Sequence, residues 1–164
     1  MTSKSVNRTP LRMILAFGLL ATTAGFTAAP AFAGDCPADQ VGVDVTKPGP
    51  SMPKDVTDEV ISSIDLSSKG DAFKGTMFRF RKLVVQPGGI VPWHEHSARP
   101  ANILVAEGSI TEYRSTCKVP IEHAAGDVTP EFGALAHWWQ NNGKVPAILY
   151  SADILPPAMD EHTM

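Results

Sequence analysis

The residues best suited to chemistry are two histidines, His94 and His96, separated by a single residue. The surrounding sequence predicts an extended segment, on which side chains at positions i and i+2 point to the same side. Two neighbouring imidazoles make half of a metal site, because neutral imidazole is a common metal ligand. An isolated histidine is more often an ordinary core or surface residue. The His-x-His spacing makes a metal site the better interpretation.

The elements that must position these histidines are short strands. Alternating apolar residues and turn residues predict strands at residues 76–85, 103–106, 109–115, 119–124, 134–140 and 145–152. Gly88 and Gly89 predict a turn before the histidines. Residues 56–66 favour a strand over a helix because of their serine and β-branched residues.

The Asn142-Gly143 pair predicts a hairpin that joins residues 134–140 to residues 145–152. No segment has the pattern of a long amphipathic helix. The sequence therefore predicts an all-β barrel or sandwich.

A third histidine, His137, lies on the predicted strand that leads into the Asn-Gly pair. Together the two histidine segments resemble the two motifs of the cupin superfamily. In the first, usually G-x5-H-x-H-x(3,4)-E-x6-G, the matching residues are Gly88, His94, His96 and Gly108. In the second, usually G-x5-P-x-G-x2-H-x3-N, Gly126, His137 and Asn141 match, whereas Pro130 and Gly133 lie two residues and one residue before the usual positions.

The resemblance covers roughly residues 76–152 and implies a cupin-type double-stranded β-helix, a jelly-roll barrel, with an irregular N-terminal arm. We expect a signal peptide at residues 1–33, the arm at 34–73, the cupin domain at 74–152 and a C-terminal tail at 153–164. The family includes dioxygenases, isomerases, decarboxylases, lyases, storage proteins and sugar-binding regulators, so the fold does not specify an activity.

One departure from the family pattern concerns the usual metal-binding glutamate, whose position is occupied by Ala101. The resemblance therefore implies only His94, His96 and His137 as ligands. Three imidazoles still bind a divalent ion with open positions, such as Fe, Zn, Mn, Ni or Cu. An ion that keeps its full charge favours an anionic ligand.

Two further residues are candidates for binding such a ligand. Strand parity places Arg99 near Ala101, where its guanidinium could bind a carboxylate, although a surface or interface ion pair is equally compatible. Parity also places Trp139 with His137, as a pocket wall or as core filler. Trp93 and Trp138 belong to the other face, in packing or in a homodimer contact.

The remaining candidates have less support from their spacing. Glu112, Tyr113 and His123 could reach a barrel interior or lie on the surface. His162, in the C-terminal tail, could bind a soft metal, but such tails are usually disordered.

The N-terminal segment predicts export. Lys4, Arg8 and Arg12 precede an apolar stretch and an Ala-x-Ala ending at Ala33, the pattern of a bacterial secretory signal peptide. The apolar stretch is too short for a membrane anchor, so we expect a periplasmic or secreted protein that is not an integral membrane protein. Cleavage removes three basic residues and no acidic ones, which changes the formal charge from −3 to −6. This acidic balance argues against nucleic acid as a partner.

The two cysteines, Cys36 and Cys117, are predicted to form a disulfide in an oxidising compartment. The leading functional hypothesis is an exported metal-binding cupin that acts on, or binds, a small anionic or oxygenated molecule, with dioxygenase-like chemistry the best-populated class within the resemblance. The alternative is a cupin that binds a small molecule without catalysis.

Overall fold

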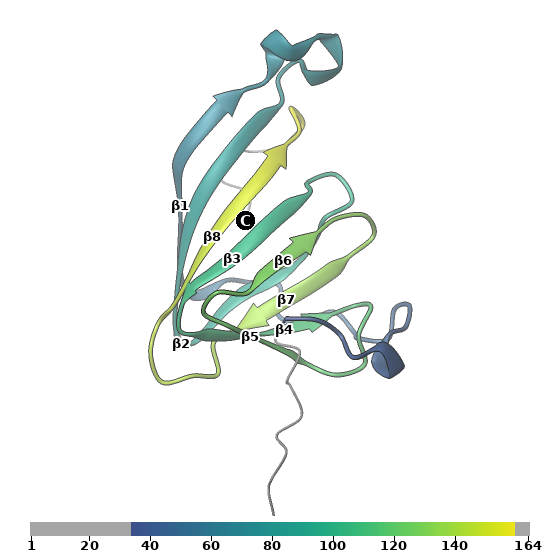
Figure 1. Cartoon of the computed structure of the whole chain (residues 1–164), viewed down its shortest axis with the longest axis vertical. Helices are drawn as coiled ribbons and strands as arrows, with labels where there is room; N and C mark the ends of the chain where they lie inside the picture. Colours follow the sequence, from purple (N-terminus) through teal and green to yellow (C-terminus); the bar gives the residue numbers. More distant parts are fainter. Residues whose placement is uncertain (1–33, 160–164) are drawn as a thin grey trace, which may run out of the picture. The chain divides into compact units, whose positions relative to one another are not determined.

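The computed structural model describes residues 34–159, which form a curled antiparallel β-sheet (Figure 1). Its eight strands are β1 (Lys54–Asp65), β2 (Met77–Glu95), β3 (Ala101–Glu107), β4 (Ser109–Arg114), β5 (Ile121–Ala124), β6 (Val128–Glu131), β7 (Ala136–Gln140) and β8 (Ala147–Leu155). The only helices in this part of the chain are three 3₁₀ turns, Ala38–Gln40, Ser67–Lys69 and Asp71–Phe73. Within residues 34–159, no helix is both long and apolar enough to span a bilayer.

The strand order is β5-β4-β7-β2-β8-β3-β6, and β1 pairs with β2. Several strands that follow one another along the chain are not neighbours in the sheet: β3 pairs with β6 and β8, whereas β4 pairs with β5 and β7. The chain thus alternates between the two halves of the sheet, as in a jelly roll. The expected all-β cupin-type barrel is confirmed at the level of the fold.

The turn expected at Gly88 and Gly89 is wrong, because β2 continues through both residues for 19 residues in all. The strand pairs with β8 as far as Val85 and with β7 from Ile90 onward. At the change of partner, Gly88 has a φ of 76° and its N–H donates to the carbonyl oxygen of Asn141 at 2.8 Å. The glycines therefore bend one long strand around the barrel, as bulges do, instead of ending it.

The hairpin expected at Asn142-Gly143 is also wrong. β7 and β8 do not pair with each other but lie on opposite sides of β2, so the loop between them crosses that strand between Val85 and Ile90. Neither Asn142 nor Gly143 has the positive φ that a two-residue hairpin requires. Instead, the buried Asn141 amide donates to the carbonyl oxygens of Val85 and Val145, each at 2.8 Å, and fixes the crossing.

The interior follows from the alternation of the strands. In the first half of β2, Phe78, Phe80, Lys82 and Val84 point outward and the intervening side chains are largely buried. The apolar core contains inward residues of five strands, among them Leu83, Val85, Val105, Ile110, Trp139 and Leu149. The region expected as an arm contributes β1, which pairs with β2 along ten residue pairs. The arm is therefore partly a component of the sheet.

The N-terminal residues of the described region are held to the barrel by the predicted disulfide, which is confirmed between Cys36 and Cys117. Val41 pairs with Cys117 in an isolated β-bridge, and the Val45 N–H donates to the carbonyl oxygen of Ser115 at 2.9 Å. The bond closes a loop with a sequence separation of 81 residues.

We predict that replacing both cysteines with serine will lower the free energy of unfolding by about 4.5 kcal/mol. Without the cross-link the unfolded chain regains conformational entropy, and for a loop of this length the gain is worth that much free energy. Chemical denaturation of the oxidised parent and the double variant measures the difference, and the reduced parent is the matched control. Two reactive thiols in denatured protein from an oxidising compartment would contradict the pairing.

Candidate metal centre

The three histidines singled out in the sequence meet inside the barrel. His94 near the end of β2 is the cross-strand partner of His137 on β7. His96 follows β2 directly, and its N–H donates to the carbonyl oxygen of Leu135 at 2.9 Å. The Nε2 atom of His137 lies 2.9 Å from Nε2 of His96 and 3.2 Å from Nε2 of His94.

Each imidazole is oriented by a partner of its other nitrogen. Nδ1 of His94 lies 2.8 Å from the carbonyl oxygen of Pro92, and Nδ1 of His96 lies 2.8 Å from that of Arg99. A carbonyl oxygen only accepts hydrogen bonds, so both Nδ1 atoms carry the proton. Nδ1 of His137 donates to the carboxylate of Glu112. All three Nε2 atoms therefore present unshared electron pairs to one another.

A carboxylate joins the three imidazoles. Glu131, at the end of β6, is 2% exposed and lies with Oε2 at 3.1 Å from Nε2 of His96 and Oε1 at 3.5 Å from Nε2 of His137. Its Oε1 is buried and has no hydrogen-bond partner among the described residues. The expectation of a centre without a carboxylate is therefore wrong. Ala101 does lack one, but its cross-strand partner is Glu131.

The geometry of these four side chains fits a metal ion. Their candidate ligand atoms lie within 4.8 Å of one another. Two ligands at about 2.1 Å from one ion are about 3.0 Å apart at right angles and about 3.4 Å apart at a tetrahedral angle. The measured separations between the Nε2 atoms, 2.9 and 3.2 Å, are close to this range. An orphaned carboxylate oxygen and three facing electron pairs are unfavourable without a cation.

Burial also selects the protonation states that bind metals. It lowers the pKa of His96 to about 3 and the pKa of His94 well below its usual value, with the neighbouring His137 adding to both effects. The two imidazoles are therefore neutral near pH 7, as a ligand must be. Burial raises the pKa of Glu131 to about 7, so metal binding there displaces a proton.

Glu112 is the main support of His137. It is fully buried, and its carboxylate lies 3.0 Å from Nε2 of His123 and accepts from the Arg114 guanidinium at 2.8 and 2.9 Å. Burial raises the pKa of Glu112, but the hydrogen bonds from His123 and His137 outweigh it and hold the pKa below its usual range. An ionised carboxylate behind a ligand fixes the tautomer and makes the imidazole more basic.

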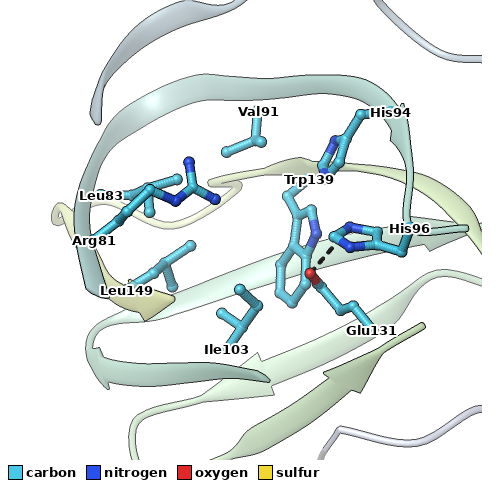
Figure 2. Close-up of a pocket in the computed structure, with 9 residues that line it drawn as sticks. All are labelled: Arg81, Leu83, Val91, His94, His96, Ile103, Glu131, Trp139 and Leu149. Carbon is cyan, nitrogen blue, oxygen red and sulfur yellow. Dashed lines mark ion pairs between the residues drawn. The ribbon is translucent and has the colours of Figure 1, made fainter. Parts of the chain in front are cut away.

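A cavity of about 20 Å³ adjoins three of the four side chains, those of His94, His96 and Glu131. Figure 2 shows His94, His96 and Glu131 on one side of it and Arg81 on the opposite side, with Trp139 between them. The remaining lining residues are aliphatic: Leu83, Val91, Ile103 and Leu149. Trp139 thus lines the cavity, and its ring centroid lies 5.6 Å from that of His137.

Arg99 is placed differently. It is 2% exposed, and its Nη1 donates to Asp153 at 2.8 Å, in a pair that excludes bulk solvent on both sides. Its backbone carbonyl is the acceptor that orients His96. Its role as a binding residue for the ligand stays a prediction that no contact in the described structure supports.

The other sequence candidates lie outside the cavity. Tyr113 and Trp138 stack on each other at 4.1 Å between ring centroids, and Asn141 holds the crossing between β7 and β8. The possible tail ligand His162, like the expected signal peptide, falls outside the described residues.

The sequence reasoning missed Glu131. The signal that could have found it was the displaced Pro130 of the second motif, because Pro130 belongs to a short strand that was not predicted. Glu131 lies immediately after that proline and shares the inward face with Thr129.

We predict that Glu131→Ala weakens metal binding strongly and that adding Ala101→Glu restores part of it. Directly opposed residues of antiparallel strands have Cβ atoms about 5 Å apart, so the new carboxylate starts beside the lost one. Titration calorimetry with Zn²⁺ and Mn²⁺ on the parent, the single variant and the double variant measures the effect. Identical affinities of the single and double variants would show that position 101 does not reach the centre.

A second prediction concerns the metal-free protein. An unfolded glutamate ionises near its usual pKa of 4.5, and Glu131 in the folded chain near 7. Stability is therefore lost as the pH rises between these values, by on the order of 3 kcal/mol at about pH 8. Metal-free Glu131→Gln should be more stable than the metal-free parent by about that amount at pH 8, and by about 1 kcal/mol or less at pH 5.

Urea denaturation at both pH values, with chelator present, tests this difference. Saturating metal should reverse the order at pH 8, since only the parent provides a charged oxygen ligand. Equal stability of the two metal-free proteins at pH 8 would contradict the raised pKa.

The likeness of this chain to known proteins lies in its structure and not in its sequence. No family model matches the sequence, and no curated protein matches it either. Among solved structures, the chain resembles the cupin domain of Schizosaccharomyces pombe Cnp3, with a TM-score of 0.43 and 12% identity over 51% of this chain and 66% of that one. It also resembles the Cupin_2 domain of an XRE family transcriptional regulator from Enterobacter cloacae (0.47, 11%, over 63% and 99%) and a predicted oxalate decarboxylase from Thermotoga maritima (0.43, 17%, over 68% and 98%).

Likeness at such low identity concerns the fold alone, so the activities of these proteins are not transferred. The strand order and the inward histidines of β2 and β7 match what the two sequence motifs imply. The described strands therefore form an all-β barrel of the kind that the two motifs predict.

Proposed function

We propose that this chain binds one divalent transition-metal ion through His94, His96, His137 and Glu131, and that a small anionic or oxygen-rich molecule occupies an open position on the ion. The observation that carries the proposal is the convergence of the Nε2 atoms of three histidines with one buried carboxylate. Three imidazoles with one carboxylate suit Fe, Zn, Mn, Ni or Cu.

The bound ion would supply Lewis acidity or a centre for oxygen chemistry. The chain's own residues supply the rest: Trp139 and aliphatic side chains wall the cavity, and Glu112 and the carbonyls of Pro92 and Arg99 keep the imidazoles in one tautomer. The cupin-type motifs make dioxygenase-like chemistry the reaction class to test first. The alternative is a protein that binds its ligand without turnover.

We also propose that the protein is exported. Its support is the N-terminal sequence pattern together with the disulfide, a bond that persists mainly in oxidising compartments.

We expect each of the variants His94→Ala, His96→Ala and His137→Ala to lose stoichiometric metal while the β fold is largely retained. Metal analysis of periplasmic preparations and far-UV circular dichroism provide the two measurements. Glu95→Ala is the matched control, because Glu95 lies between the two histidines but is exposed and accepts only from Ser97. Full metal occupancy in any two of the histidine variants would contradict the assignment of the three histidines as metal ligands.

Oxygen uptake by the metal-loaded protein, on a panel of small acids and phenols, separates the enzyme from the binding protein. Metal-dependent uptake with one of these compounds would support dioxygenase-like chemistry. Stoichiometric binding without uptake or product would support the non-catalytic alternative.

A further inference from the structure

We propose that Arg81 is the second anchor of the ligand and that the ligand is a compact acid with two oxygen-rich ends, one at the metal and one, a carboxylate, at the Arg81 guanidinium. This inference rests on the proposed function, since it assigns the far side of the same cavity. Figure 2 shows the Arg81 guanidinium directed into the cavity from the side opposite His96 and Glu131.

The hydrogen bonds of Arg81 leave one edge of its guanidinium open. Nη1 is paired with Asp58, whereas Nη2 has only long contacts, 3.3 Å to Asp153 and 3.4 Å to Ser151. Nε is buried and has no hydrogen-bond partner in the described structure. Nε and Nη2 form the edge that binds a carboxylate with two parallel hydrogen bonds.

The neighbouring inward arginine of the same strand shows what this edge does when it is satisfied. Nε and Nη2 of Arg79 donate to the two carboxylate oxygens of Asp153 at 2.9 and 2.7 Å. Arg81 is almost as far removed from solvent, at 4% exposure, but in the described structure Asp153 approaches only Nη2 of the corresponding edge, at 3.3 Å, and Nε has no partner. A buried donor without a partner costs free energy, and a ligand carboxylate would recover it.

The charges inside the barrel favour the same ligand. Four arginines face four carboxylates there, so the protein charges cancel once Glu131 has lost its proton to the metal: Arg79, Arg81, Arg99 and Arg114 against Asp58, Asp153, Glu112 and Glu131. A divalent ion adds two positive charges to this interior. Uncompensated buried charge is costly, so an anion with up to two charges suits the metal-bound state.

The size and walls of the cavity limit the ligand. The cavity between the two anchors is narrow, about 20 Å³ in all, so the ligand must be a compact molecule. Leu83, Val91, Ile103 and Leu149 surround the path between Arg81 and the histidines. The segment joining the two ends of the ligand is therefore short and apolar.

The test compares malonate with its monomethyl ester. Malonate has a carboxylate for each of the two anchors, whereas the ester has a carboxylate for only one of them. Calorimetry measures binding to the metal-loaded parent and to the double variant Arg81→Gln with Asp58→Asn, which removes one charge of each sign. Removing one partner of a buried charge pair costs at least 2 kcal/mol, so we expect malonate to bind the double variant at least about 30-fold more weakly than the parent. The ester should bind the parent with a similar loss, and the double variant should distinguish the two ligands much less.

Two controls isolate the role of Arg81. Asp58→Asn alone keeps the guanidinium, and Lys82→Gln removes a positive charge from the outward face of the same strand. Asp58→Asn should bind malonate at least as tightly as the parent, because it removes a carboxylate that competes for the Arg81 guanidinium, and Lys82→Gln should bind malonate like the parent. Circular dichroism and metal stoichiometry establish that each variant is folded and loaded.

The outcomes separate this inference from the function on which it rests. Absence of stoichiometric metal in the parent would overturn the proposed function. Three results would overturn the Arg81 inference while leaving the metal centre in place. The metal-loaded parent could fail to bind malonate, it could bind the ester as tightly as malonate, or it could bind malonate no more tightly than the metal-loaded double variant does. The comparison of malonate with its ester on the parent protein needs no variant. It therefore decides the matter even if the double variant does not fold.

Discussion

The interaction on which the centre depends is the repulsion between three imidazole electron pairs and a carboxylate held within a few ångströms of one another. The chain maintains this arrangement by occupying every Nδ1–H elsewhere: with Pro92 and Arg99 carbonyls for His94 and His96, and with Glu112 for His137. None of the rings can turn to relieve the repulsion without leaving a buried donor unpaired. A proton on Glu131, whose pKa burial raises, relieves part of the repulsion, whereas a metal ion compensates all four groups, and the separations between the nitrogens match one.

The long strand β2 connects this centre to the rest of the barrel interior. Its first half directs Arg79 and Arg81 inward, and its last residues place His94 opposite His137. Both sets point into one space because the strand bends at Gly88 and exchanges β8 for β7 as its partner. A turn at that point would have separated the arginines from the histidines. The bend therefore determines that a metal ligand and a buried guanidinium can face the same cavity.

Glu131 shows how a neighbouring strand can supply a carboxylate that the sequence motif lacks at Ala101. Ala101 and Glu131 are paired across β3 and β6, so their side chains leave the same face of the sheet as neighbours. A ligand can move from one strand to the next and still reach the same point. Glu131 also brings the buried carboxylates into balance with the buried arginines, which leaves the charge of a metal ion to be met by its ligand.

By itself, the sequence determined the class of the fold, the pairing of Cys36 with Cys117 and the identity of three residues that meet in the interior, because alternation, cysteine count and His-x-His spacing are local signals. Its turn signals misled at Gly88, where the glycine serves a bend, and at Asn142-Gly143, where the preceding Asn141 holds a crossing between distant strands. Only the tertiary structure decided that Glu131 completes the centre and that Arg81, rather than Arg99, faces the cavity. The physical reason is register: which side chains become neighbours across a sheet depends on how far each strand slides along its partner, and no single strand carries that information.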